Sequence, residues 1–146
     1  KFFKIILSHS YFHMGKRACK KTYGYIDNTI YQINSIIESD KDIIDRKIYY
    51  IGDYEPYDIT EWSNEIAGIA GIKIPRIPYF LFYIAGKFGD ILKKAGITFP
   101  MTSFRLKNMT TNNIHNLQPI QQIAPLLPIN RIEGSKVTIE WIRNNK

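Results

Sequence analysis

Tyr83 and Lys87 are the residues whose types and spacing come closest to a catalytic pair. They stand four positions apart in the segment YIAGK, so on a helix both side chains lie on one face. A lysine at that distance can lower the pKa of the tyrosine and prepare it for proton transfer. However, no serine or threonine stands at the upstream spacing that would complete a triad, and no glycine-rich phosphate loop accompanies the pair. We interpret the match as accidental and predict no catalytic residue in this chain.

A second candidate is a group of basic and aromatic residues: Lys16, Arg17, Lys20, Lys21, Tyr23 and Tyr25. Cations between aromatic rings can bind single-stranded nucleic acid through phosphate contacts and base stacking. The same side chains can hold one nucleotide diphosphate. Alternation along a strand offers a third interpretation, in which the tyrosines enter the core and the lysines face water. The residues alone leave these three interpretations open.

Metal and cofactor sites are not predicted in this chain. His9 and His13 are four positions apart, but no nearby carboxylate completes a zinc site. The glycine pairs in GIAG (68–71) and GKFG (86–89) lack a preceding strand and a third glycine, so they do not indicate a dinucleotide loop. Cys19 is the only cysteine. A chain without disulfides fits a reducing compartment, and we expect a cytoplasmic protein.

The composition predicts one folded domain with a basic surface. The chain has 146 residues, of which 45% are hydrophobic and 23% charged, which suffices for a core. Its net charge of +7 favours an anionic partner such as phosphate, nucleic acid or an acidic membrane surface. The longest apolar run, Ile77–Gly86, is too short to span a bilayer, and no signal-peptide cleavage site follows KFFKIIL. Because the chain opens at Lys1 on a helix-like segment, we expect it to begin in mid-protein.

Local signals predict several helices. Asp58 precedes Glu61 by three positions, as in a capping box, and Gly71 is placed to end that helix. Asp27 is expected to cap another helix, in which isoleucines recur at helical spacing. The expected helices cover residues 2–8, 27–37, 58–70, 78–95, 102–109 and 133–143.

Two strands are predicted, at 20–26 and 47–52. The segment IKIPRIP (72–78) must be extended, because each proline excludes the preceding residue from the helical region. Pro119, Pro125 and Pro128 are expected to interrupt the stretch before the last helix. This mixed α and β pattern with few strands is more typical of an accessory lobe than of a complete doubly wound sheet.

Four segments, in order, resemble the C-terminal part of the extended short-chain dehydrogenases, the NAD-dependent epimerase/dehydratase family. KTYGYIDN is similar to that family's Arg-Asp-Phe-x-Tyr-Val-x-Asp motif, with Lys21 at the arginine position and Thr22 at the first aspartate. KIYYIGDYEPYDITEWSNEIAGIAG resembles the strand and helix that follow. KIPRIPYFLFYIAGKFGDIL resembles the proline-led apolar helix after them, and EGSKVTIEWI resembles the closing helix. The resemblance covers nearly the whole chain.

This resemblance implies an α/β fold class: the mostly helical substrate lobe, with a few short strands, of a Rossmann-type enzyme. Residues 1–146 would form the C-terminal substrate-binding region, and an N-terminal Rossmann half, absent here, would bind NAD or NADP and carry the catalytic tyrosine and lysine. The substrate would be a nucleotide sugar or a similar small molecule. This chain alone is expected to bind no cofactor and to be inactive, and a homodimer is left open.

The resemblance also implies substrate contacts from Lys21, Tyr23 and Arg105. In the family the motif's arginine often contacts the substrate diphosphate, and Lys21 keeps the charge but not the bidentate fork. Arg105 is a second candidate phosphate contact, because the family often has an arginine near this place. Asp27 and Asn28 are expected to cap the helix and fix the loop.

Two alternatives remain beside the nucleotide-sugar enzyme. One is a basic nucleic-acid-binding module without activity. The other is the lobe of a steroid or lipid-alcohol dehydrogenase of the same superfamily, suggested by the apolar segment PYFLFYIAG. The leading interpretation expects no nucleic-acid partner and no membrane span. It also expects apolar surface to stay uncovered when the lobe is alone.

Overall fold

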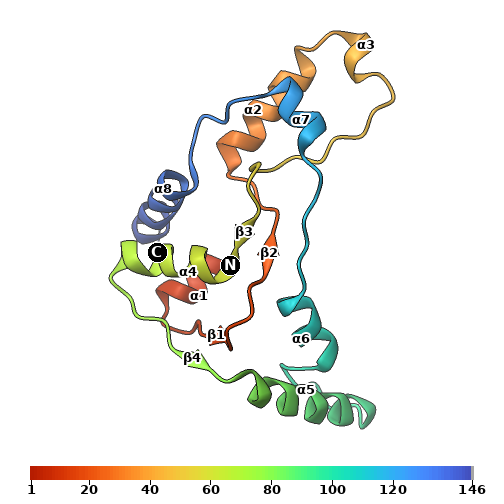
Figure 1. The fold of residues 1–146 in the computed structure, drawn as a ribbon. Coiled ribbons are helices and arrows are strands. Elements are labelled where there is room, and N and C mark those ends of the chain that lie inside the picture. Colours follow the sequence, from red (N-terminus) through yellow and green to blue (C-terminus); the bar gives the residue numbers. More distant parts are fainter. Residues whose placement is uncertain (146) are drawn as a thin grey trace. The chain divides into compact units, whose positions relative to one another are not determined.

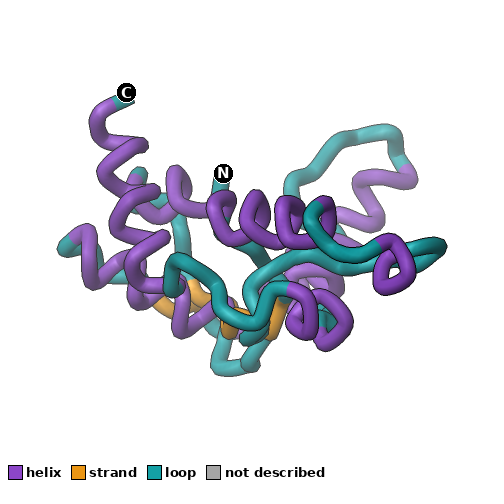
Figure 2. The backbone as a smooth tube through the Cα atoms, turned by 90° about the horizontal axis from the view of Figure 1, so that it is seen from above, coloured by secondary structure: helices purple, strands orange, loops and turns teal. Residues whose placement is uncertain are grey.

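The computed structural model describes residues 1–145, which form two compact units. Unit 1 comprises residues 1–19 and 58–112, and unit 2 comprises residues 20–57 and 113–145. Helices make up most of the regular structure of both units, and each strand is two residues long (Figure 1; Figure 2). The expected mostly helical fold with a few short strands is confirmed.

Unit 1 combines four helices with a two-stranded parallel sheet. Its elements are α1 (Phe2–Leu7), β1 (His13–Met14), α4 (Ile59–Ala70), β4 (Arg76–Ile77), α5 (Tyr79–Lys94) and α6 (Ser103–Thr110). In the sheet, His13 lies opposite Arg76 and Met14 lies opposite Ile77. The extended conformation expected between the two prolines at 75 and 78 is therefore confirmed.

The core of unit 1 lies where α1 packs on α4. Ile6 and Ile66 are almost completely buried. The rings of Phe2 and Phe3 lie 5.0 and 5.5 Å from the Trp62 ring, so three aromatic side chains cover the same side of α4. These contacts bury the apolar face that the sequence predicts for each helix.

Both ends of α4 are set by the residues that the sequence predicts. The Asp58 carboxylate accepts hydrogen bonds from the backbone N–H groups of Thr60 at 2.9 Å and Glu61 at 3.2 Å. Gly71 ends the helix with a φ of +73°, a left-handed conformation that suits glycine.

Glycines allow α5 and α6 to pack closely. A Cβ on Gly89 would collide with the carbonyl oxygen of Met101, and a Cβ on Gly86 would lie 3.2 Å from the Ser103 nitrogen. Asp90 on α5 accepts a hydrogen bond from the Ser103 N–H at 3.0 Å. The start of α6 is thereby fixed to α5 by an acidic side chain.

Asp90 should make the α5–α6 pair sensitive to acid. Its hydrogen bonds to the Ser103 side chain and backbone hold the pKa of Asp90 below its ordinary value of 3.8. A lowered folded-state pKa stabilises the fold above the ordinary value, and this contribution is lost as pH falls through the folded-state pKa. Asp90→Asn should therefore lower stability at neutral pH, and its difference from the wild type should shrink in acid. Urea unfolding over a pH series measures this, with Asp27→Asn as control, and a pH-independent difference would contradict it.

Unit 2 contains these helices and strands in full: β2 (Lys20–Lys21), α2 (Ile26–Ile37), α3 (Lys41–Ile44), α7 (Gln118–Ile123) and α8 (Arg131–Asn144). The remaining strand is β3 (Tyr57–Asp58), of which Tyr57 belongs to unit 2 and Asp58 to unit 1. β2 pairs with β3, Lys21 also forms a parallel bridge to Asn113, and α2 packs against α7. The predicted last helix is confirmed as α8. The short helix α7 was not predicted, and it accommodates Pro119 because the first turn of a helix needs no N–H at that position.

Helix α2 buries a polar face and exposes an apolar one. Asn28 and Gln32 are fully buried, whereas the isoleucines of the opposite stripe are 41–71% exposed: Ile26, Ile30, Ile33 and Ile37. The helix itself is confirmed, but the predicted cap is wrong. Tyr25 is the N-cap, no side chain caps the helix start, and Asp27 lies in the first turn.

The strand predicted at 47–52 is wrong. No β partner lies beside this segment among residues 1–145, and Ile48 is 87% exposed. The Gln32 side chain takes the place of a strand partner, because its amide donates to the Gly52 carbonyl at 2.8 Å and accepts from the Gly52 N–H at 3.0 Å. The strand predicted at 20–26 covers only Lys20–Lys21, and beyond it the Tyr23 carbonyl accepts a hydrogen bond from the Asp53 N–H at 2.7 Å.

Gly52 has no room for a side chain. A Cβ there would lie 2.9 Å from the Tyr23 carbonyl oxygen, so we expect Gly52→Ala to lower the free energy of unfolding by about 1–3 kcal/mol.

Gly68, inside α4, has nothing within 4 Å of its Cβ position. Gly68→Ala should therefore raise stability by about 0.5–1 kcal/mol, since glycine disfavours helix interiors. Urea unfolding measures both changes, and two changes of the same sign would contradict this account.

Candidate functional site

A buried carboxylate organises the candidate site in unit 2. Asp53 is 7% exposed and accepts hydrogen bonds from the Asn28 amide at 2.8 Å, from the Tyr25 N–H at 3.3 Å and from the Tyr57 hydroxyl. The Asp53 N–H donates to the Tyr23 carbonyl at 2.7 Å. We call Asn28, Asp53 and Tyr57 the Asp53 cluster. The cluster joins three parts of the chain: Asn28 lies near the start of α2, Asp53 directly follows Gly52, and Tyr57 lies in β3.

Asn28 extends this cluster to the segment before α8. Its Nδ2 also donates to the Ile129 carbonyl at 2.8 Å, and its Oδ1 accepts from the Ile129 N–H at 3.0 Å. The amide thus pairs both backbone groups of one residue, as a neighbouring strand would. Because Asn28 and Ile129 are 101 positions apart, this contact fixes the C-terminal segment beside Asp53. The expectation that Asn28 fixes a loop is confirmed.

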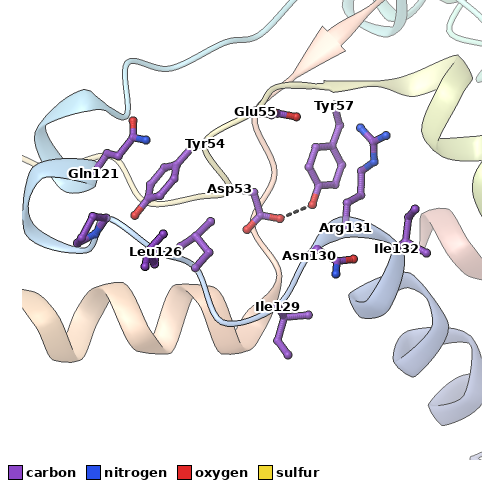
Figure 3. Close-up of a pocket in the computed structure, with 12 residues that line it drawn as sticks. Asp53, Tyr54, Glu55, Tyr57, Gln121, Leu126, Ile129, Asn130, Arg131 and Ile132 are labelled. Atoms are coloured by element: carbon purple, nitrogen blue, oxygen red, sulfur yellow. Dashed lines mark hydrogen bonds between the residues drawn. The ribbon is translucent and has the colours of Figure 1, made fainter.

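A cavity of about 640 Å³ lies beside the cluster (Figure 3). Aromatic, aliphatic and charged side chains line it, among them Tyr54, Glu55, Tyr57, Leu126, Arg131 and Ile132. The Tyr54 hydroxyl donates to the Ala124 carbonyl, and burial raises the pKa of Tyr54 above its ordinary value of 10.0. The phenol therefore stays neutral at physiological pH. Cavities of this size are typical of small-molecule sites, which combine apolar walls with a few polar groups.

Arg131 brings a positive charge to the cavity. It is the first residue of α8, whose N-cap Asn130 accepts a hydrogen bond from the Glu133 N–H at 2.9 Å. The Arg131 guanidinium carbon lies 5.3 Å from the centre of the Tyr57 ring, and the two side chains lie side by side in Figure 3. The Tyr23 ring lies 6.1 Å from the same ring. A guanidinium beside aromatic rings suits an anionic ligand that also has a flat part, such as a nucleotide.

The predicted site residues fall into both units. Lys21 ends β2 and is half-buried, and Tyr23 follows it beside Tyr57, so both belong to unit 2 near the Asp53 cluster. Arg105 belongs to unit 1, where it is exposed on α6 and its Nη1 donates to the Pro100 carbonyl at 2.9 Å. The structure thus groups Lys21 with Tyr23, and it places Arg105 in the other unit.

Asp53, Tyr57 and Arg131 were not predicted from the sequence. A signal for Arg131 exists, because Asn130 precedes Glu133 by the spacing of a helix cap and so puts Arg131 at a helix start. Asp53 has no comparable signal, since its partner Asn28 lies 25 positions away and no local pattern joins them.

The other candidates of the sequence give no second site. Tyr83 and Lys87 do share one face of α5, where the lysine Nζ lies 5.6 Å from the centre of the ring. Within residues 1–145, no cluster of three or more His, Cys, Asp or Glu side chains could hold a metal ion. None of the helices in that range is both long and apolar enough to cross a membrane.

Comparison with known proteins shows what fold this is. No protein-family model and no curated protein matches the sequence. Two solved structures of UDP-glucuronic acid 4-epimerase from Bacillus cereus do match. The complex with NAD has a TM-score of 0.62 and 13% identity, over 98% of this chain and 37% of that one. The complex with UDP-glucuronic acid and NAD has a TM-score of 0.63 and 14% identity, over 99% of this chain and 39% of that one. The chain therefore has the fold of part of that enzyme and spans well under half of its length.

Proposed function

We propose that this chain is the substrate-binding region of an NAD- or NADP-dependent epimerase/dehydratase of the extended short-chain dehydrogenase family. The observation that carries the proposal is the fold shared with UDP-glucuronic acid 4-epimerase over 98–99% of the chain. The order of the family-like segments, beginning with KTYGYIDN, supports it independently. A Rossmann half with the catalytic tyrosine and lysine would complete the enzyme.

The cofactor would serve as hydride acceptor for oxidation of a sugar hydroxyl. The sequence of this chain holds no glycine-rich turn after a strand, so we assign none of its residues to the cofactor. Its own role is to bind and orient a nucleotide sugar. Lys21 and Arg131 would neutralise the diphosphate, and Tyr23 and Tyr57 would offer flat surfaces to the base. Held in this way, the sugar meets the catalytic groups in a fixed geometry and away from water.

Ligand binding by the purified chain tests this proposal. We expect UDP-glucuronic acid to bind more tightly than glucuronic acid in isothermal titration, and to shift the amide resonances of residues in unit 2. If the chain ignores UDP and UDP-sugars but binds RNA with a steep salt dependence, the nucleic-acid-binding module replaces this proposal.

Lys21→Ala should weaken binding of UDP-glucuronic acid by about 1–3 kcal/mol, the range of a charge-assisted contact. Lys20→Ala is the matched control. It removes the same charge one position earlier, and adjacent strand residues face opposite sides. Isothermal titration measures the loss of binding free energy in both variants. Equal losses in the two would mean that net charge, and not a contact at Lys21, attracts the ligand.

A further inference from the structure

Helix α5 presents a continuous apolar stripe to solvent. Phe80, Ile84, Phe88 and Ile91 are 53–65% exposed and follow one another at intervals of three or four residues, so they lie on one side of the helix. The opposite side carries the buried residues Phe82, Gly86 and Gly89: the Phe82 ring stacks on the Phe12 ring, and the two glycines pack against the segment that leads into α6. The helix is therefore apolar on both sides. On the exposed side the Phe88 ring contacts the Phe99 ring at 5.7 Å, and the four residues of the stripe stay more than half exposed.

Long cationic side chains border the exposed stripe. At 100° per residue, Lys87 and Lys94 lie at its edge, together with Tyr83, over whose ring the Lys87 ammonium is placed at 5.6 Å. Residues 79–110, which hold α5 and α6, contain five basic residues and one acidic residue. That acid, Asp90, accepts a hydrogen bond from the Ser103 N–H at the start of α6. The surface is thus apolar along its middle and carries two lysines along one edge.

We propose that α5 binds an anionic lipid surface and lies flat on it. Phe80, Ile84, Phe88 and Ile91 would enter the boundary between headgroups and acyl chains, as bulky apolar residues of interfacial helices do. Lys87 and Lys94 would extend their flexible stems and reach the lipid phosphates. The two lysines along one edge of the apolar stripe are the feature that selects an anionic bilayer as its occupant. This proposal does not depend on the substrate site of unit 2.

Helix α2 shows that an exposed apolar stripe alone does not predict binding to an anionic lipid surface. Its isoleucines are exposed to a similar degree, yet residues 26–40 contain three acidic residues and no basic one. An anionic surface would repel that helix. The two stripes therefore provide a matched pair on one chain, alike in apolarity and opposite in charge.

Flotation with lipid vesicles tests the proposal. We expect the chain to float with vesicles of phosphatidylcholine mixed with phosphatidylglycerol, and to stay in the dense fraction with phosphatidylcholine alone. Ile84→Glu should lower partitioning by about tenfold or more, because a buried aliphatic side chain is replaced by a charge that the lipids repel. Ile30→Glu makes the same change on α2 and should leave partitioning unchanged. Both positions are exposed, and circular dichroism checks that each variant keeps its helices.

A second variant keeps the test independent of Ile84. Lys87→Gln should lower partitioning by about fivefold, and adding Lys94→Gln by about fivefold more, since each cation near such a surface contributes about that factor. Equal loss in the Ile84 and Ile30 variants, or equal flotation with both vesicle types, would overturn the proposal. So would a chain that self-associates through α5 in light scattering, or a full-length gene product that stays in the dense fraction. Loss of UDP-glucuronic acid binding would leave it standing.

Discussion

Replacing Asn28 with alanine is expected to lower the free energy of unfolding by about 3–5 kcal/mol, because the change strips several buried groups of their partner at once. The Asp53 carboxylate loses one of its donors, and the N–H and carbonyl of Ile129 lose the amide that pairs them. A buried carboxylate with too few donors is the costliest of these defects. Urea unfolding followed by circular dichroism measures the change.

Asn34→Ala is the control for this prediction. Asn34 lies on the same helix but is exposed, so its removal should change stability by no more than about 0.5 kcal/mol. Equal effects of the two substitutions would mean that α2 is held by its backbone alone. In that case the Asp53 cluster would have no part in joining the two chain segments of unit 2.

Arg131→Glu is expected to weaken binding of UDP-glucuronic acid by about 3–5 kcal/mol, which removes it from the measurable range. The substitution turns an attraction for the diphosphate into a repulsion at the rim of the cavity. The fold should tolerate it, because the first turn of a helix favours a negative side chain. Isothermal titration measures the binding, and thermal unfolding checks that stability is unchanged.

Lys136→Glu provides the matched charge change on the same helix. Lys136 is exposed further along α8 and does not line the cavity, so its reversal should cost no more than about 0.5 kcal/mol of binding. If the two variants bind alike, the ligand does not occupy the cavity beside Tyr57.

Elements whose signals are local could be predicted from the sequence, and α4 is the clearest case. Its cap at Asp58, its apolar spacing and its stop at Gly71 all lie within fourteen consecutive residues and agree with one another. The segment at 47–52 has equally strong strand propensity, yet it forms no strand. A strand needs a neighbour, and here the Gln32 amide occupies the Gly52 backbone groups instead.

The candidate site could be predicted only in part, because its contacts are distant in sequence. Lys21 and Tyr23 stand in a recognisable motif, and the structure places them near the Asp53 cluster. No periodic pattern in the sequence predicts the hydrogen bonds of Asn28 to Asp53 and Ile129. The exposed side of α2 illustrates the same limit. Isoleucine spacing predicts the helix, but the polar residues Asn28 and Gln32 decide which side is buried.

The order in which unit 2 can be completed follows from its two separate segments. During translation Asn28 emerges 101 residues before Ile129, the residue whose backbone it pairs. At ribosomal rates of roughly 5–20 residues per second, that interval lasts on the order of 5–20 seconds. For that time Asn28 lacks its Ile129 partner, whereas Asp53 follows it after 25 residues and Gly52 follows Gln32 after 20. The last segment of unit 2 therefore closes onto a helix whose other polar contacts can form first.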